Sequence, residues 1–233
     1  MKRFSLPVIP ILAFSMVFGV ISPVFGLTIV SFSDVDRLDK SGGGSWSVNG
    51  TSTESLLAGN ASSSIALFET AVLIDIAPYD TEIGAASSIT FNIAYDAVLG
   101  TGQDVTAYFF GTNSSTINSI GGQTFHDTAL AGSSAGTILV GDFSAPGVAS
   151  YDATSIVQSL TGFDYAAILL TSGLTSDTSS TAHDISFYDD DDIGSQPNGG
   201  AYLTIVPEPS SVALVLVCGL STLVMTARWR RPR

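Results

Sequence analysis

The sequence predicts an all-β protein: a single β-sandwich of jelly-roll type, flanked by an N-terminal signal peptide and a C-terminal transmembrane helix. Three observations lead to this prediction. Residues 27–206 are rich in Ser, Thr, Gly and β-branched residues and poor in Lys and Glu, which favours strands over surface helices. Short apolar segments recur in that stretch between turn-forming clusters. Charged residues make up only 12% of the chain, and most of the bases lie at its two apolar ends.

The N-terminal segment has the pattern of a signal peptide. Lys2 and Arg3 precede an almost wholly apolar stretch over residues 4–21. Small or tolerated residues before position 27 predict cleavage after Gly26, so that residues 1–26 are removed. The alternative is an uncleaved N-terminal anchor, which the prolines of this segment disfavour because they interrupt a continuous helix.

Residues 27–206 are expected to form one extracytoplasmic β domain, which is long enough for one well-filled core. Residues 88–95 alternate polar and apolar side chains, as a half-buried strand does. Residues 166–170 form a continuous apolar run and fit a central strand. The expected strands are 27–33, 64–68, 71–76, 88–95, 104–111, 137–141, 147–151, 166–171, 184–188 and 201–206.

One short helix is expected within this domain, over residues 152–160. Asp152 and Thr154 are its candidate N-caps, and Gly162 is placed to close the turn that follows. Clusters of Gly and Asn predict loops at 42–50, 111–122 and 194–200.

The C-terminal segment, residues 207–233, has three parts in a fixed order. Pro207-Glu208-Pro209 comes first, and its prolines hold the backbone extended. An uncharged stretch at about 210–227 follows, short but adequate to span a bilayer as a transmembrane helix. The chain ends in an arginine cluster that should stay in the cytoplasm and fix the orientation: Arg228, Arg230, Arg231 and Arg233. The alternative is a plain tail anchor, in which the Pro-Glu-Pro motif is only a rigid spacer.

This order of motif, apolar helix and terminal arginines resembles the PEP-CTERM sorting signal, and the likeness covers residues 206–233. That family is found in Gram-negative bacteria that make exopolysaccharide, and its tail is processed by a membrane protease-transpeptidase called exosortase. The resemblance implies that Pro207, Glu208 and Pro209 form the sorting motif and that exosortase is a partner. It also implies export, transient anchoring in the cytoplasmic membrane, and a final place at the cell surface or outside the cell.

A second likeness concerns residues 64–206. The short helix beginning near Asp152 is followed by a Gly-Phe turn and an apolar strand, and residues 71–76 and 87–91 form an earlier strand pair. This pattern resembles DNRLRE-type domains, which are similar to carbohydrate-binding jelly rolls on bacterial surface proteins. The name motif of that family is absent, and Glu69-Thr70 stands where it usually has an arginine. The resemblance implies a jelly-roll fold and a polysaccharide partner.

Charge and composition argue against several classes of function. A formal net charge of −13 is unsuited to binding nucleic acid through its phosphates. A single Cys excludes a disulfide framework and a Cys-ligated zinc site. His126 and His183 each adjoin an Asp, but neighbours on a strand face opposite sides, and no nucleophile-elbow motif is present. We therefore expect surface or loop histidines and no catalytic residue.

An acidic run provides the candidate metal ligands: Asp189, Asp190, Asp191 and Asp192. Carboxylate oxygens at this density suit Ca²⁺. The spacing is not that of an EF-hand loop, however, and a solvated acidic loop is the alternative. A second acidic cluster at 34–39 is partly neutralised by two nearby bases, which makes it a weaker candidate. No other cofactor is expected.

Together these features predict an exported cell-surface or extracellular-matrix protein that exosortase sorts. Its β domain is expected to be a non-enzymatic binding or structural module associated with exopolysaccharide or biofilm. The alternative is a secreted carbohydrate-active hydrolase. Acids are abundant enough for that chemistry, but the sequence singles out no pair of carboxylates.

Overall fold

The computed structural model describes most of the predicted β domain. The predicted signal peptide at 1–26 and the chain from Pro209 onward lie outside the described residues. The described ranges are 27–41, 44–49, 56–60, 66–99, 105–131, 136–140, 147–172, 183–187 and 200–208.

Strands dominate this part of the chain, and every strand pairing within it is antiparallel, which confirms the all-β prediction. The strands are β1 (Thr28–Ser31), β2 (Asp34–Ser41), β3 (Ser47–Asn49), β4 (Leu56–Asn60), β5 (Ala66–Asp75), β6 (Ala86–Leu99), β7 (Val105–Thr112), β8 (Gly136–Val140), β9 (Gly147–Asp152), β10 (Tyr165–Thr171), β11 (His183–Phe187) and β12 (Ala201–Pro207). The helices are short: η1 (Ala77–Tyr79), α2 (Asp80–Gly84), α3 (Ile117–Ile120), α4 (Gly122–Leu130) and α5 (Thr154–Gln158).

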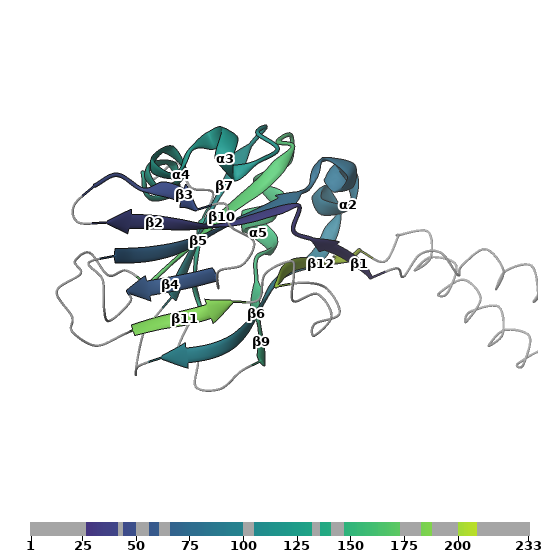
Figure 1. Ribbon diagram of the computed structural model, residues 1–233. Coiled ribbons are helices and arrows are strands. Elements are labelled where there is room, and N and C mark those ends of the chain that lie inside the picture. The colour runs from purple at the N-terminus through teal and green to yellow at the C-terminus, as the bar shows by residue number, and fades with distance from the viewer. Residues whose placement is uncertain are drawn as a thin grey trace, which may run out of the picture.

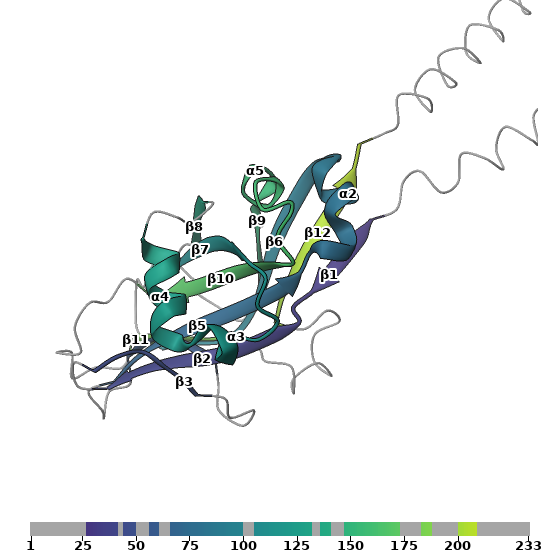
Figure 2. The same cartoon turned by 90° about the horizontal axis from the view of Figure 1, so that it is seen from above.

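The strands form two antiparallel sheets that a continuous hydrogen-bonded path joins (Figures 1 and 2). On one side of this path β1, β12, β6 and β9 pair with one another. On the other side β3, β2, β5, β10, β7 and β8 pair in that order. Two long strands change partners along their length: β6 pairs with β12 and then β11, while β5 pairs with β4 and then β10. Because β11 pairs with β4, these two strands link the sheets.

The main core lies between the two sheets. Ile89, Phe91 and Ile93 of β6 are buried there beside alternate residues of β5, β10 and β7. Phe91 and Phe109 meet edge to face with ring centroids 5.3 Å apart, which ties one sheet to the other.

A second core covers the other face of the sheet that contains β10. Ala167 and Leu169 point into it, together with Phe110 of β7 and Phe125 of α4, whose rings meet edge to face at 4.9 Å. Strand β10 is therefore buried on both faces, and its continuous apolar run at 166–170 is explained. This agrees with the expectation of a central strand.

The expected helix at 152–160 is confirmed in part, but its expected N-cap is wrong. The helix expected over 152–160 is present as the shorter α5, and Gly162 closes the following turn with φ of 94°. The backbone N-cap is Ala153, so neither expected N-cap residue holds that position. Instead, the Asp152 carboxylate accepts hydrogen bonds from the amide and hydroxyl of Thr154 at 3.0 and 2.6 Å.

Several boundaries predicted from sequence are wrong. The described residues of the predicted strand 64–68 and residues 71–75 of the next belong to one strand, β5, which runs without a break through Glu69 and Thr70. Strands β2, β3 and β4 were not expected, and the predicted loops at 42–50 and 111–122 contain β3 and α3. The third predicted loop, at 194–200, lies outside the described residues except for Gly200.

Candidate functional site at the paired chain ends

The two ends of the described domain lie side by side. Strand β1 pairs antiparallel with β12, so that Thr28 lies opposite Ile205 and Ile29 opposite Thr204. The start of β1 therefore adjoins the end of β12, where the predicted sorting motif begins (Figure 1). We call this region the paired-ends region; it comprises residues 27–29 and 204–208 and the neighbouring segment 80–88.

The first residue of the motif is part of the sheet. Strand β12 extends to Pro207, which lies opposite Ala86 after a register shift between Val206 and Pro207. Proline has no backbone N–H group to donate to a neighbouring strand. It is compatible with this position because it is the last residue of the strand, where that hydrogen bond is not required. The fold thus includes one residue that the sequence had assigned to the tail.

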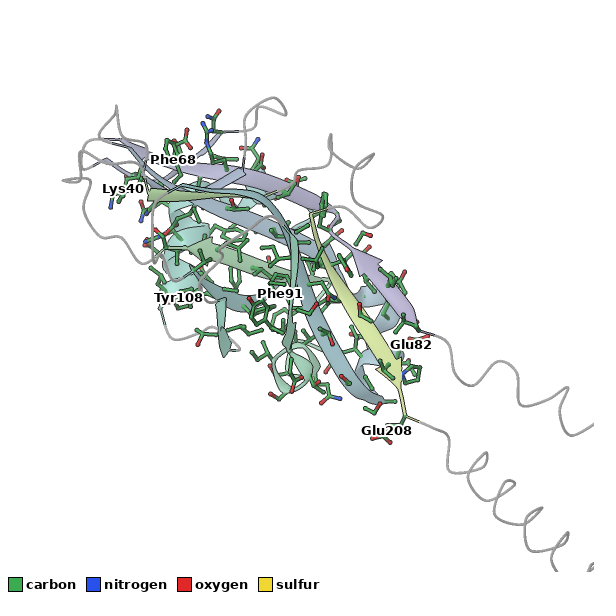
Figure 3. The ribbon with its side chains drawn as sticks, turned by 90° about the horizontal axis from the view of Figure 1, so that it is seen from below. Lys40, Phe68, Glu82, Phe91, Tyr108 and Glu208 are labelled. Carbon is green, nitrogen blue, oxygen red and sulfur yellow. The ribbon has the colours of Figure 1, made fainter. Side chains whose placement is uncertain are left out.

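Hydrogen bonds from the start of β6 hold the motif in place. The hydroxyl of Ser87 donates to the carbonyl oxygens of Val206 and Pro207 at 3.1 and 3.4 Å. The amide of Glu208 donates to the carbonyl oxygen of Ala85 at 3.3 Å. The backbone of Glu208 is therefore fixed, while its side chain is exposed (Figure 3).

Helix α2 packs beside this junction. Pro78 is the second residue of the preceding η1, and Ile83 anchors α2 because its side chain is completely buried in the main core. The side-chain amide of Gln158 on α5 donates to the carbonyl oxygens of Ile83 and Ala86 at 3.3 and 3.0 Å. Glu82 remains exposed and lies at the same end of the molecule as Glu208 (Figure 3). Two exposed carboxylates therefore lie at the end of the domain where β12 ends.

The other predicted site residues lie outside the described residues. These are Pro209, the arginine cluster and the acidic run at 189–192. Within the described ranges, no helix has the length and apolar character needed to cross a membrane. Over the same ranges, no three potential metal-ligating side chains gather in one place.

A second polar cluster lies under α4, and sequence analysis did not predict it. Glu69 on β5 is only 4% exposed, and its carboxylate lies 2.7 Å from Nδ1 of His126 on α4. The ring of Trp46 stacks on that imidazole at 4.8 Å, and Lys40 lies over the indole at 5.6 Å from the ring centroid. His126 is thus half-buried on a helix and paired with a distant acid, which corrects the expectation of a surface histidine.

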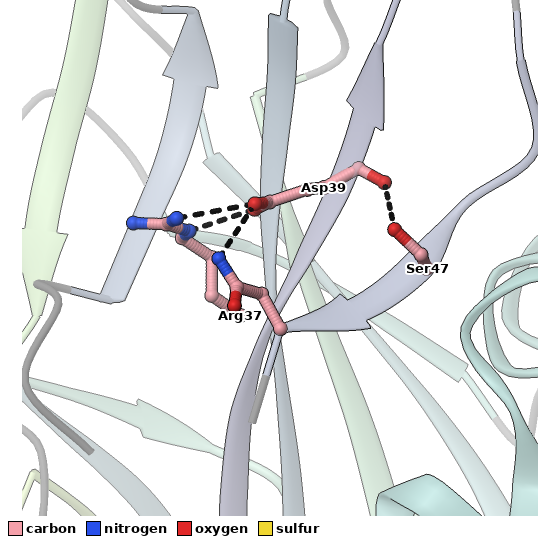
Figure 4. A network of polar contacts seen from close by, with 4 residues as sticks. Arg37, Asp39 and Ser47 are labelled. Atoms are coloured by element: carbon pink, nitrogen blue, oxygen red, sulfur yellow. Dashed lines mark hydrogen bonds and ion pairs between the residues drawn. The ribbon is translucent and has the colours of Figure 1, made fainter. Parts of the chain in front are cut away.

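A third polar cluster lies on the opposite face of β2 (Figure 4). Arg37 and Asp39 are two residues apart on one strand, so their side chains point the same way and form a bidentate pair at 2.7 and 3.1 Å. Asn49 of β3 donates to the same carboxylate at 2.9 Å, and Arg37 also lies over the ring of Phe68. This cluster holds β3 against β2, which is a structural role. It also removes Asp39 from the acidic cluster that the sequence offered as a weaker calcium site.

The Glu69–His126 pair is joined by one hydrogen bond. Among the described residues, the partner of the His126 ring in this bond is the Glu69 carboxylate. One signal in the sequence could have revealed it: Glu69 interrupts an otherwise apolar segment that forms a buried strand, and a buried carboxylate requires a partner. The paired-ends region remains the better candidate because it contains residues of the predicted sorting motif. Comparison of the chain with protein-family models and with curated proteins finds no match.

Proposed function

We propose that this chain is an exported protein whose C-terminal tail directs it to exosortase, and that its β domain is then displayed at the cell surface or in the extracellular matrix of a Gram-negative bacterium. In this proposal the domain is a non-enzymatic binding or structural module associated with exopolysaccharide. The tail anchors the chain in the cytoplasmic membrane until it is processed.

The pairing of β1 with β12 is the observation that supports this proposal best. The predicted cleavage after Gly26 lies just before β1. The predicted motif begins at Pro207, which is the last residue of β12. Both predicted membrane segments therefore adjoin the same end of the domain. Before cleavage after Gly26, a domain with this arrangement can be held at a membrane by both ends, without the chain having to cross its surface.

The proposed roles differ along the tail. Glu208 is the recognition element, because its exposed carboxylate projects from a fixed backbone next to two prolines. The apolar stretch at 210–227 holds the chain in the bilayer. The arginines from Arg228 to Arg233 fix its orientation.

For the domain itself we propose a jelly-roll sandwich without catalytic activity. The support for the sandwich is a main core enclosed by two antiparallel sheets. The hydrolase alternative predicts turnover of a polysaccharide or an ester. Reproducible turnover that is lost when a single acid is changed would refute the non-enzymatic assignment.

Substitution of the proposed recognition element tests the sorting function. In cells that contain exosortase, Glu208→Ala should leave membrane insertion intact and block removal of the tail, as measured by the mass of the protein. Glu82→Ala is the matched control, since Glu82 is also an exposed glutamate at the same end of the domain. Processing of Glu208→Ala at the wild-type rate would contradict the role proposed for Glu208.

A further inference from the structure

Three exposed apolar side chains gather beside the sorting motif. Leu27, Ile29 and Val206 are 61%, 42% and 39% exposed, whereas their strand neighbours Val30 and Ile205 are buried. Alternate residues of a strand share a face, and Ile29 lies opposite Thr204. The three side chains therefore lie on the outward face of β1 and β12. We call them the paired-ends patch.

The patch and the motif have a fixed relative position. The hydroxyl of Ser87 bonds to the carbonyl oxygens of Val206 and Pro207, and the amide of Glu208 bonds to Ala85. Because β12 also pairs with β1, Ile29 is held at a constant distance from Glu208 despite their separation in sequence. A partner that binds Glu208 would meet the patch in the same orientation in every molecule.

We propose that the paired-ends patch is a docking surface for the membrane-embedded protease that processes the tail, an inference that rests on the proposed function. The position of the patch supports this occupant, because only Pro209 separates the last described residue, Glu208, from the predicted membrane stretch at 210–227. The protease must therefore approach the domain at this end.

The surrounding charge indicates the chemistry of that partner. Glu208 is exposed at this end, and a carboxylate disfavours contact with an anionic lipid surface. A complementary protein surface would present apolar side chains to the patch and at least one basic group to Glu208. The patch supplies apolar contact, and the motif supplies the charged contact.

The substitution Ile29→Thr tests the docking surface without altering the motif. Threonine keeps the strand preference and removes apolar contact area. In cells with exosortase, we expect tail removal in this variant to be at least about threefold slower than in wild type, measured by pulse–chase and mass. Ile29→Leu, which keeps an apolar side chain, should be processed at close to the wild-type rate and guards against a general defect in folding.

Val148→Thr is the matched control, because Val148 is 44% exposed on β9, another outward strand position away from the chain ends. Its processing should equal that of wild type. Wild-type processing of Ile29→Thr would overturn the docking surface and leave the proposed function standing. A wild-type tail that persists in the presence of exosortase would refute both. A patch that binds lipid or a second copy of the chain would change vesicle binding or oligomeric state without slowing processing, and that result would also overturn the inference.

Discussion

Substitution of the paired residues Glu69 and His126 gives a quantitative test of the packing under α4. The substitution His126→Ala removes the imidazole that lies 2.7 Å from the carboxylate of Glu69, a residue that is only 4% exposed in the wild-type fold. Removing one partner of a buried pair costs about 3–5 kcal/mol, because the other is left buried without its hydrogen-bonding partner. The His126 side chain is 18% exposed, so water can replace part of the lost interaction, and we expect about 3 kcal/mol.

A double-mutant cycle separates this effect from the loss of ring stacking on Trp46. Glu69→Gln keeps the shape and a hydrogen-bonding group, so its cost should be about 1 kcal/mol. The double variant has no buried carboxylate that lacks its partner, and we expect it to cost about 2 kcal/mol, which gives a coupling energy of about 2 kcal/mol. The free energy of unfolding of the full chain in mild detergent, from urea denaturation followed by circular dichroism, provides the measurement. Strictly additive costs, or His126→Ala within about 0.5 kcal/mol of wild type, would refute this reasoning.

Three other predictions concern separate parts of the domain. Gly122→Ala should destabilise the fold by about 1–3 kcal/mol in the same assay. The Cβ atom of the new alanine would lie 2.9–3.0 Å from the backbone of β3 and of Trp46, the residue before β3. Hydrogen bonds from the Thr154 side chain and amide lower the pKa of Asp152, so its ionised form favours the fold above the unfolded pKa of about 3.9, and this contribution is lost as pH falls through the folded pKa. Thr154→Val should raise that pKa in an NMR titration, and an unchanged pKa would contradict the assignment. If the acidic run binds Ca²⁺, millimolar Ca²⁺ should raise the melting temperature of wild type but not of Asp190→Asn/Asp191→Asn, whereas a solvated loop gives no response in either.

The strands with the clearest apolar patterns could be predicted from sequence. Residues 88–95 belong to β6, and the apolar run at 166–170 forms β10, because side-chain alternation and continuous burial each leave a direct trace in the sequence. Strand β2 was missed because five of its eight residues are charged: Asp34, Asp36, Arg37, Asp39 and Lys40. Charged residues are uncommon in strands. Here the bidentate contact between Arg37 and Asp39, visible only in three dimensions, makes the charges compatible with a sheet.

The candidate site was predictable only in part. The Pro-Glu-Pro motif can be identified from the chain alone, since it depends on residues that are adjacent in sequence. The hydrogen bonds of the motif to Ala85 and Ser87 could not be predicted from the sequence, because they depend on the register of β12 against β6. The same holds for Glu69 and His126, which lie on different elements and meet only after α4 packs on the sheet. Helix α4 itself was hidden by the glycines at its N-terminal end, which resemble a loop in sequence.

The mass of the mature protein in cells with and without exosortase tests the central claim most directly. The proposed function predicts that the tail is removed near Pro207-Glu208-Pro209 when exosortase is present, and that the chain ending at Arg233 persists when it is absent. An intact tail through Arg233 in both kinds of cell would mean that the segment is only a membrane anchor, and it would contradict the account.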